Sequence, residues 1–537
     1  FMPSHPGDCD TLRGMWASRG RTVIWFVLAG AVAALANGPR ALALAAWLAP
    51  LFWLRALQGV GVRSGALLGG LVYGAATAVA ARGMLPLEGG LYLLAALGIG
   101  MGAVAPFVVQ RALAPRLPRP LIPLVLPVVA TAMEFLGGRL QPFGSFGAVA
   151  YTQVGWLGLV QVAAVAGLPG IAFLIYLPAA LVHWAVEFRP SPAELLRAGL
   201  AFALLLLAAV GLGTARLHRD GGDAPVVPVA VVSSPLNGRV SELLAPAYAT
   251  GDPAAVDWLQ ALHQGELATT DLLRRTQRAA QAGARIIVWP ETAALVAAES
   301  ESTLLRTAGA LSRNHRVYLA LALGVVRHRA RPWPAGDGAL DNKVTLLGPR
   351  GEVVAEYRKG VAVPGPEAEL LVPGSGDIPL VTTPYGRLAL AICFDLDFPR
   401  LMRRAAGADL VLVPAEDWRG ITPYHSDMAR LRAIEGGYSL VRATRYGRSL
   451  AADARGRLLA TQEDSPWPAE DPLLLAQVPL RGVRTLYERT GDAFGWLTVG
   501  AFFLLGLCAL ARRRRGAGAI LVDERPTGAG DHRETPP

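Results

Sequence analysis

The stretch from Leu388 to Asp395 reads Leu-Ala-Leu-Ala-Ile-Cys-Phe-Asp, an apolar run that ends in a cysteine and then turns. A continuous apolar run of this length predicts a buried strand. A thiol at the end of such a strand, here Cys393, can be exposed at the turn as a nucleophile, whereas a structural cysteine would stay within the strand. From this stretch alone, the nucleophile and the buried thiol are equally good interpretations.

Alternating strand and helix patterns surround this run between residues 215 and 492. Apolar β-branched runs predict strands there, and two segments of helical period, 269–284 and 424–436, predict helices. The predicted strands are 226–232, 285–289, 317–325, 342–347, 351–357, 388–393 and 410–414. This alternation predicts an α/β domain in which helices cover a layered sheet.

The rest of the chain is far more apolar. With 53% hydrophobic and 17% charged residues, the composition is typical of a membrane protein. Runs long enough to approach or cross a bilayer lie at about 22–37, 41–57, 64–81, 89–110, 121–138, 167–187, 197–214 and 493–511. Residues 143–166 are also apolar but glycine-rich, which fits a ninth span or an interfacial or re-entrant segment. We expect the first run to be a retained helix, because a second apolar run follows it directly.

The loop arginines favour eight spans. In the short loops and tails, one side then receives Arg13, Arg19, Arg21, Arg55, Arg63, Arg111, Arg116, Arg119, Arg189, Arg197 and Arg512–Arg515, and the other side receives only Arg40, Arg82 and Arg139 in its short loops. The positive-inside rule then places both termini in the cytoplasm and residues 215–492 on the periplasmic or outer face. The predicted organisation is a cytoplasmic tail (1–20), a seven-helix membrane domain (21–214), a periplasmic domain (215–492), a closing span (493–511) and a basic, then disordered, cytoplasmic tail (512–537).

Charge and cysteine content exclude some classes of function. The net charge of +10 does not indicate nucleic-acid binding, because many arginines lie in short loops between apolar runs and form no basic stripe. The three cysteines, Cys9, Cys393 and Cys508, show no CxxC spacing and no neighbouring histidine set. We therefore expect neither a disulfide framework nor zinc, and no cofactor.

Two further side chains stand at the ends of predicted strands. Glu291 follows Trp289 and Pro290, and apolar neighbours would raise its pKa towards that of a useful general base. A carboxylate at a helix N-terminus is the alternative interpretation. Lys359 also follows a strand and could stabilise a developing oxyanion, although a surface lysine is the simpler interpretation. His425 is interpreted as a helix cap or surface residue rather than a base.

Together these fragments resemble the carbon–nitrogen hydrolase (nitrilase) superfamily. The matching stretches are Trp289–Thr292, the Lys359 segment, Ile392–Pro399, Gly407–Pro414 and Arg432–Glu435. The resemblance implies an αββα sandwich with Glu291 as general base, Lys359 as oxyanion stabiliser and Cys393 as nucleophile. It also implies that Glu367 supports catalysis.

Seven spans before this domain and one after it resemble the apolipoprotein N-acyltransferase family, as does the segment Thr485–Asp492. The resemblance implies a multi-pass protein of the bacterial inner membrane that uses two lipid substrates. A phospholipid acyl ester would acylate Cys393 as a thioester, and the α-amine of a diacylglyceryl-cysteine lipoprotein would then take the acyl group. Holding both lipid-anchored substrates at one membrane face raises their effective concentration.

Three stretches depart from the family pattern. Phe394-Asp395 stands where the family has Tyr-Glu, so we expect these two residues to bind substrate. Ser233–Asn237 and Ala415–Trp418 also differ from the family's motifs. Two other functions stay open: a membrane-tethered nitrilase-like amidase or hydrolase, and a non-catalytic lipid- or lipoprotein-binding paralogue.

Overall fold

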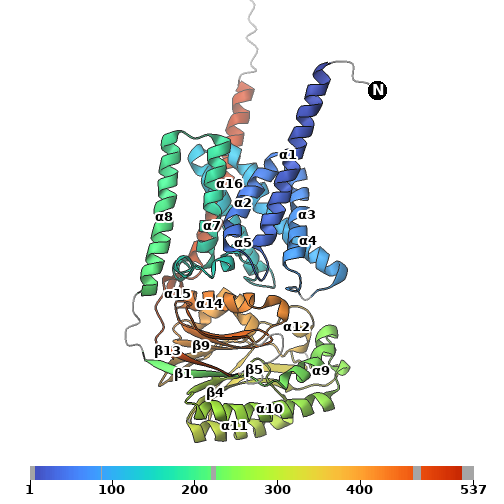
Figure 1. Cartoon of the computed structure of the whole chain (residues 1–537), viewed down its shortest axis with the longest axis vertical. Coiled ribbons are helices and arrows are strands. Elements are labelled where there is room, and N and C mark those ends of the chain that lie inside the picture. The colour runs from blue at the N-terminus through green and yellow to red at the C-terminus, as the bar shows by residue number, and fades with distance from the viewer. Residues whose placement is uncertain (1–5, 86, 219–224, 335, 464–472, 523–537) are drawn as a thin grey trace, which may run out of the picture.

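The computed structural model describes residues 6–85, 87–218, 225–334, 336–463 and 473–522. A bundle of long helices stands above an α/β domain, and the first and last helices extend beyond the bundle on the side opposite that domain (Figure 1). The chain therefore has the predicted architecture, a helical membrane domain joined to an α/β domain.

Eight long helices build the bundle in the described part of the chain. They are α1 (Pro6–Ala36), α2 (Ala43–Gln58), α3 (Val62–Ala80), α4 (Gly89–Leu113), α5 (Ile122–Leu140), α7 (Ala163–Phe188), α8 (Pro192–His218) and α16 (Ala493–Val522). By length and composition, six of the described helices could cross a membrane, whereas the apolar part of α1 and all of α2 are shorter.

The predicted N-terminal tail is helical from Pro6 onward, as part of α1. The disorder predicted within 512–537 needs correction up to Val522, because α16 continues to that residue. The predicted disorder at 523–537 lies outside the described residues.

The glycine-rich segment 143–166 does not form a ninth span. It folds into a 3₁₀ turn at Val149–Gln153 and a short helix α6 at Leu157–Val160. Gly167 then breaks the helical path at the start of α7, with φ +64°. This segment lies in the bundle on the side of the α/β domain, which agrees with the re-entrant alternative.

Two mixed sheets form the α/β domain. The first has the order β13 (Leu473–Pro479), β1 (Val226–Val232), β2 (Ile286–Val288), β4 (Tyr318–Val326), β5 (Leu340–Leu347), β6 (Val353–Arg358), with β3 (Ala294–Ala297) also paired to β4. The second has the order β12 (Leu458–Glu463), β11 (Arg448–Ala452), β10 (Ser439–Arg445), β9 (Leu410–Glu416), β8 (Gly386–Leu390), β7 (Leu380–Thr383). Apolar side chains such as Val229, Ile286, Leu390 and Val441 form one core between them.

Helices cover the outer faces of both sheets. Helices α10 (Trp258–Gln281) and α11 (Glu301–His315) lie outside the first sheet, and α14 (Tyr424–Gly436) lies between the second sheet and the membrane helices (Figure 1). This is the predicted αββα sandwich, with one of its outer layers facing the membrane domain.

The ends of strands from both sheets meet at one place. Strand β9 is parallel to β8 and to β10, so their carboxyl ends lie at the same edge. The backbone N–H of Glu291, just after β2, donates to the carbonyl of Ala415 in β9 at 3.3 Å. This contact joins the two sheets where the predicted site residues lie.

The membrane domain holds the turn that follows β8. The backbone N–H and the hydroxyl of Ser145 both donate to the carbonyl oxygen of Asp397, each at 2.7 Å. Ser145 also bonds Tyr151 at 2.7 Å, and Arg432 of α14 donates to the Tyr151 hydroxyl at 3.0 Å. Segment 143–166 is therefore attached to Asp397, the fourth residue after Cys393.

We predict that Gly144→Ala loosens this attachment. Gly144 has φ +56°, and a Cβ there would lie 2.4 Å from the Asp397 carbonyl oxygen. The variant should lower the thermal unfolding midpoint in detergent by a few degrees, because the turn and the segment must separate. Gly147→Ala is the matched control, with φ +84° and open space around its Cβ. If both variants lower the thermal midpoint equally, the loss comes from the positive φ of the substituted residue and not from contact with the Asp397 carbonyl.

Candidate active site

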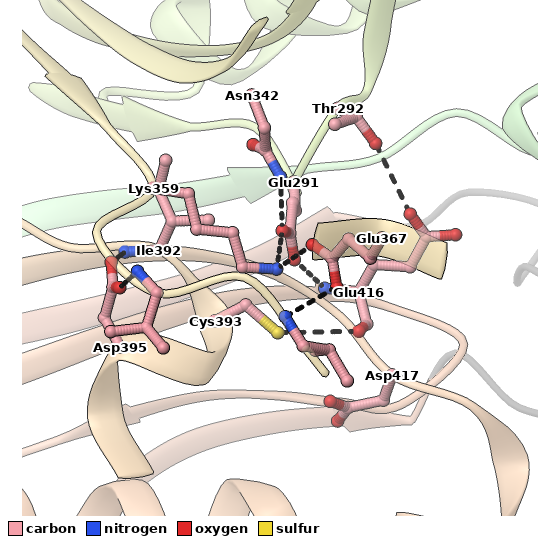
Figure 2. Close-up of polar contacts among 12 residues, drawn as sticks. Glu291, Thr292, Asn342, Lys359, Glu367, Ile392, Cys393, Asp395, Glu416 and Asp417 are labelled. Carbon is pink, nitrogen blue, oxygen red and sulfur yellow. Dashed lines mark hydrogen bonds and ion pairs between the residues drawn. The ribbon is translucent and has the colours of Figure 1, made fainter. Parts of the chain in front are cut away.

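Glu291, Lys359 and Cys393 come together at the junction of the two sheets (Figure 2). Lys359 Nζ donates to Glu291 Oε1 at 2.9 Å and to Glu367 Oε1 at 2.5 Å. All three residues are buried, with residue exposures of 3% for Glu291, 5% for Lys359 and 4% for Cys393. The structure thus gathers four residues that the sequence separates widely.

The Glu291 carboxylate is held at both oxygens. Oε1 accepts the Lys359 bond and a second bond from Asn342 Nδ2 at 2.7 Å, while Oε2 accepts the backbone N–H of Glu416 at 2.9 Å. Asn342 lies within β5, and the backbone carbonyl of the same residue accepts the N–H of Lys359 at 2.9 Å. No local pattern marks Asn342 as a site residue, because its amide lies in an otherwise ordinary strand.

Cys393 begins a 3₁₀ turn that runs to Asp397, and its φ of +45° is uncommon for a residue with a side chain. This conformation directs the thiol out of the strand line, and Sγ lies 3.6 Å from the carbonyl oxygen of Glu416. The N–H of Phe394 belongs to the first turn of a helix, where backbone donors have no partner within the helix. A backbone donor without a partner in the helix therefore follows the thiol directly.

The pKa of Glu291 is lowered, whereas the sequence led us to expect a raised value. Burial does raise the pKa of Glu291, but the Lys359 charge and the hydrogen bonds from Lys359 and Asn342 outweigh it, so the pKa lies below its ordinary value. Burial alone would lower the pKa of Lys359, yet Glu291 and Glu367 hold it well above its ordinary value. At neutral pH the site therefore contains an ionised Glu291 beside a charged Lys359.

The pKa values of Glu367 and Cys393 are raised, in contrast to that of Glu291. Burial, assisted by the Glu291 charge, raises the pKa of Glu367 despite the opposing effect of Lys359. Burial and Glu291 also raise the pKa of the Cys393 thiol well above its ordinary value. The two carboxyl groups thus have pKa values pushed apart, which suits them to different roles.

Phe394 and Asp395 occupy different environments. Phe394 lines the large cavity described below and packs edge-on against Phe398, with 5.2 Å between ring centroids. Asp395 is fully buried and does not line that cavity. The substrate contact expected of Asp395 is therefore not made by this geometry, whereas Phe394 stays a candidate.

Asp395 instead joins the cysteine turn to the lysine loop. Its carboxylate accepts the N–H of Ile392, the N–H of Val361 and the Tyr357 hydroxyl, each at 2.9 Å. Burial raises the pKa of Asp395 to about 7. This residue positions Cys393 relative to the segment that carries Lys359.

His425 is neither a cap nor a surface residue, contrary to the expectation. It is 4% exposed, and its ring nitrogens contact Asp417 at 2.8 Å and Asp397 at 3.0 Å. Burial would lower the pKa of His425, but these two carboxylates raise it to about 9. Arg442 bonds both Asp417 oxygens at 2.8 and 2.9 Å, so the cluster is an ion-pair network.

One group of side chains here has the ligand types of a cation site. Ligand atoms of Cys393, Asp417 and His425 lie within 4.8 Å of one another. The Asp417 carboxylate is already bonded to Arg442, however, and this guanidinium would oppose a bound cation. We therefore interpret the group as a charged support next to the thiol.

A cavity of about 1500 Å³ connects the site with the interior of the helical bundle. Glu291, Lys359 and Cys393 line one end of it, and apolar side chains of the bundle, among them Ile99 and Phe107, line another part. Trp418, just after β9, donates to the carbonyl of Gly83 in the α3–α4 loop at 2.9 Å and helps to close the wall between the domains. The thiol therefore faces a space shared with the membrane helices.

An αββα fold with buried Glu, Lys and Cys at its strand ends, joined to a bundle of apolar helices, defines a membrane-anchored enzyme of the nitrilase type. Residues 245–488 match the family model described as carbon–nitrogen hydrolase. Residues 29–181 match the model described as apolipoprotein N-acyltransferase N-terminal domain.

Individual relatives agree with these matches. An apolipoprotein N-acyltransferase of Geobacter metallireducens is 28% identical over 401 residues, which are 70% of each chain. The deaminated glutathione amidase of Mus musculus is 30% identical over 243 residues, 40% of this chain and 73% of that protein. An amidase from Nesterenkonia sp. aligns in structure with 51% of this chain and 95% of its own, at 21% identity and a TM-score of 0.38. The chain belongs to the carbon–nitrogen hydrolase superfamily, and the match of its helical part supports an N-acyltransferase of that superfamily.

The His425 network predicts a pH dependence of stability. The pKa of His425 rises from 6.5 to about 9 on folding, so the folded state binds this proton more tightly between these values. Stability from this residue is fully present below about pH 6.5 and is lost as the pH rises through about 9. The thermal midpoint in detergent should fall over this range, and His425→Gln should flatten the decline. An equally steep decline in the variant would contradict the assignment.

Asp395→Asn should separate the two loops that Asp395 joins. An amide has one acceptor oxygen, so at least one of the two backbone donors loses its partner, at a cost of about 1–3 kcal/mol. Unfolding in detergent, followed by tryptophan fluorescence, should show this loss together with reduced turnover. Asp377→Asn, an exposed carboxylate paired with Arg404, is the control and should change little. Wild-type stability in Asp395→Asn would rule out the positioning role.

Proposed function

We propose that this protein transfers an acyl chain from a phospholipid, through a thioester on Cys393, to the α-amine of a diacylglyceryl-cysteine lipoprotein. The observation that carries the proposal is the cavity of about 1500 Å³, which joins the buried thiol to the apolar interior of the helical bundle. A nucleophile that opens towards membrane helices suits lipid substrates better than small solutes. The family match supports the same reaction class.

In the first step the Cys393 sulfur attacks the ester carbonyl carbon of the phospholipid. The thiol is protonated at rest, and Glu291 takes its proton as the carbon–sulfur bond forms. The oxyanion that develops is stabilised by the Lys359 ammonium and the Phe394 N–H. The carbon–oxygen bond then breaks, Glu291 returns the proton to the glycerol oxygen, and a lysophospholipid leaves.

In the second step the neutral α-amine of the lipoprotein attacks the thioester carbonyl. Glu291 accepts a proton from the attacking nitrogen, and the same two donors stabilise the second oxyanion. The carbon–sulfur bond breaks, and the Cys393 sulfur regains a proton from Glu291. One amide is formed and the enzyme returns to its starting state.

Glu367 would keep Lys359 oriented through both steps. Its Oε2 accepts the N–H of Val363 at 3.1 Å, which anchors the carboxyl group on the loop after Lys359. Glu367 therefore supports the cation without competing for the thiol proton.

Acyl transfer from the thioester to the lipoprotein amine must be faster than hydrolysis of the thioester by water. An apolar cavity between the domains limits water at the sulfur, and both substrates reach it from the lipid phase. We further propose that the catalytic domain lies on the periplasmic face of the bacterial inner membrane, as the distribution of loop arginines indicates.

A membrane-anchored amidase or hydrolase is the second candidate function. It is supported by the similarity to the deaminated glutathione amidase of Mus musculus, which extends over 40% of this chain. In that case water would replace the lipoprotein amine at the thioester.

We expect Cys393 to gain the mass of one acyl chain when purified protein is mixed with phospholipid. Adding a diacylated lipopeptide should remove the adduct and produce an N-acylated peptide, measured by mass spectrometry. Cys393→Ala should abolish both products, whereas Cys508→Ala, which alters a cysteine in α16, should leave them unchanged.

The alternatives predict different products. Free fatty acid without N-acyl peptide would favour the hydrolase, and an unmodified Cys393 in the presence of lipid would favour a binding protein. Rescue of a strain that lacks lipoprotein N-acylation by the parent gene, but not by Cys393→Ala, would test the reaction in cells.

A further inference from the structure

A second polar cluster lines the part of the cavity that lies inside the helical bundle. It is formed by side chains from α2, α3, α5 and α7 and from the residue that follows α1. These are Asn37, Trp53, Tyr73, Thr131, Glu134 and Tyr176. None of them has a role in the acyl-transfer steps described above.

Several polar atoms in this chamber have no hydrogen-bond partner among the described residues. They are the Nε1 atom of Trp53 and the hydroxyls of Thr77 and Thr131. All three residues line the cavity and are nearly inaccessible, with exposures of 0%, 4% and 1%. Buried polar groups are normally satisfied. The Trp53 Nε1–H can only donate, but the two threonine hydroxyls can accept a bond from a donor group that enters the cavity.

Glu134 gives this chamber its charge. Its Oε2 accepts the N–H of Val149 at 3.2 Å, and in the described part of the chain no lysine or arginine forms an ion pair with it. Acidic residues within membrane helices are rare, and they are retained where a cation or proton compensates the charge. Glu134 faces the cavity, where a ligand can supply that compensation.

The neighbours of Glu134 fit a cation rather than an anion. Tyr73 of α3 and Tyr176 of α7 line the same cavity as Glu134. The Tyr73 hydroxyl accepts a bond from Asn37 at 3.2 Å. Thr131 precedes Glu134 by three residues and therefore lies on the same face of α5. A cavity lined by a carboxylate, phenol rings and hydroxyl oxygens is complementary to an ammonium group.

We propose that Glu134, with Tyr73 and Tyr176, binds a primary ammonium group carried by a lipid substrate. The inference rests on the proposed function, because it places this lipid in the cavity that ends at Cys393. Two sources share the chemistry: the aminoethyl headgroup of a donor phospholipid and the α-ammonium of the acceptor. Either would bring its acyl chains against the apolar walls of the same cavity.

Glu134→Gln tests the charge while keeping an acceptor for the Val149 N–H. Purified full-length protein in micelles is mixed with phosphatidylethanolamine or phosphatidylglycerol of identical acyl chains, and thioester formation on Cys393 is timed. If the headgroup is bound, the variant reacts about 10- to 100-fold more slowly with phosphatidylethanolamine and normally with phosphatidylglycerol. If the acceptor is bound, both donors react normally and the KM for a diacylated lipopeptide rises by the same factor at unchanged kcat.

Glu187→Gln is the matched control, because it also removes a carboxylate from the bundle. Glu187 lies in α7, its side chain is 40% exposed, and its nearest recorded cation, Arg55, is 4.0 Å away. This variant should leave all three measurements unchanged. Equal slowing of every reaction in Glu134→Gln, or no change in any, would overturn the ammonium site.

A binding experiment separates this inference from the proposed function. Cys393→Ala protein, which cannot react, should retain phosphatidylethanolamine over phosphatidylglycerol, or the lipopeptide over its N-acetylated form, in native mass spectrometry. The double variant with Glu134→Gln should lose that preference. A Glu134-dependent preference without thioester formation in the parent would refute the acyl transfer alone. Thioester formation without such a preference would refute the ammonium site alone.

Discussion

The active site depends on one buried cation, the Lys359 ammonium between Glu291 and Glu367. Placing charges in a protein interior is unfavourable unless each has partners of good geometry, and removing one partner leaves the others uncompensated. Here the cation holds together the end of β2, the end of β6 and the short helix that carries Glu367. The same contact keeps Glu291 ionised beside a thiol that burial keeps protonated.

A second constraint connects this site to the membrane. The turn that starts at Cys393 is held on one side by Asp395, which bonds the lysine loop, and on the other by Ser145, which bonds Asp397. Cys393 is therefore positioned jointly by the α/β domain and by segment 143–166 of the bundle. A fold related to that of deaminated glutathione amidase here carries a buried thiol beside a cavity that extends among the membrane helices.

The comparison of sequence and structure is most informative where the two differ. No strand was expected after residue 436, although β10 to β13 follow there. In β10 the buried side chains include Arg442 and Arg445, which interrupt the apolar pattern because they pair with carboxylates from β9 and the residue after it. The expectation of a cap or surface role for His425 is wrong for the same reason. Its partners Asp417 and Asp397 lie on other segments of the chain, and a histidine at the start of a helix does not reveal them.

The sequence by itself determined the long helices and most strands of the α/β domain, and it singled out Glu291, Lys359, Glu367 and Cys393, whose catalytic roles stay a prediction. Hydrophobic period and run length depend on local pattern, and strand-end motifs lie in short contiguous segments. Tertiary structure alone decided that segment 143–166 does not form a long helix, that Asp395 joins two loops and that Glu291 has a lowered pKa. It also placed Glu134 in the cavity that ends at Cys393. These properties arise from contacts between segments far apart in the chain, because burial and neighbouring charge, rather than local sequence, set the state of an ionisable group.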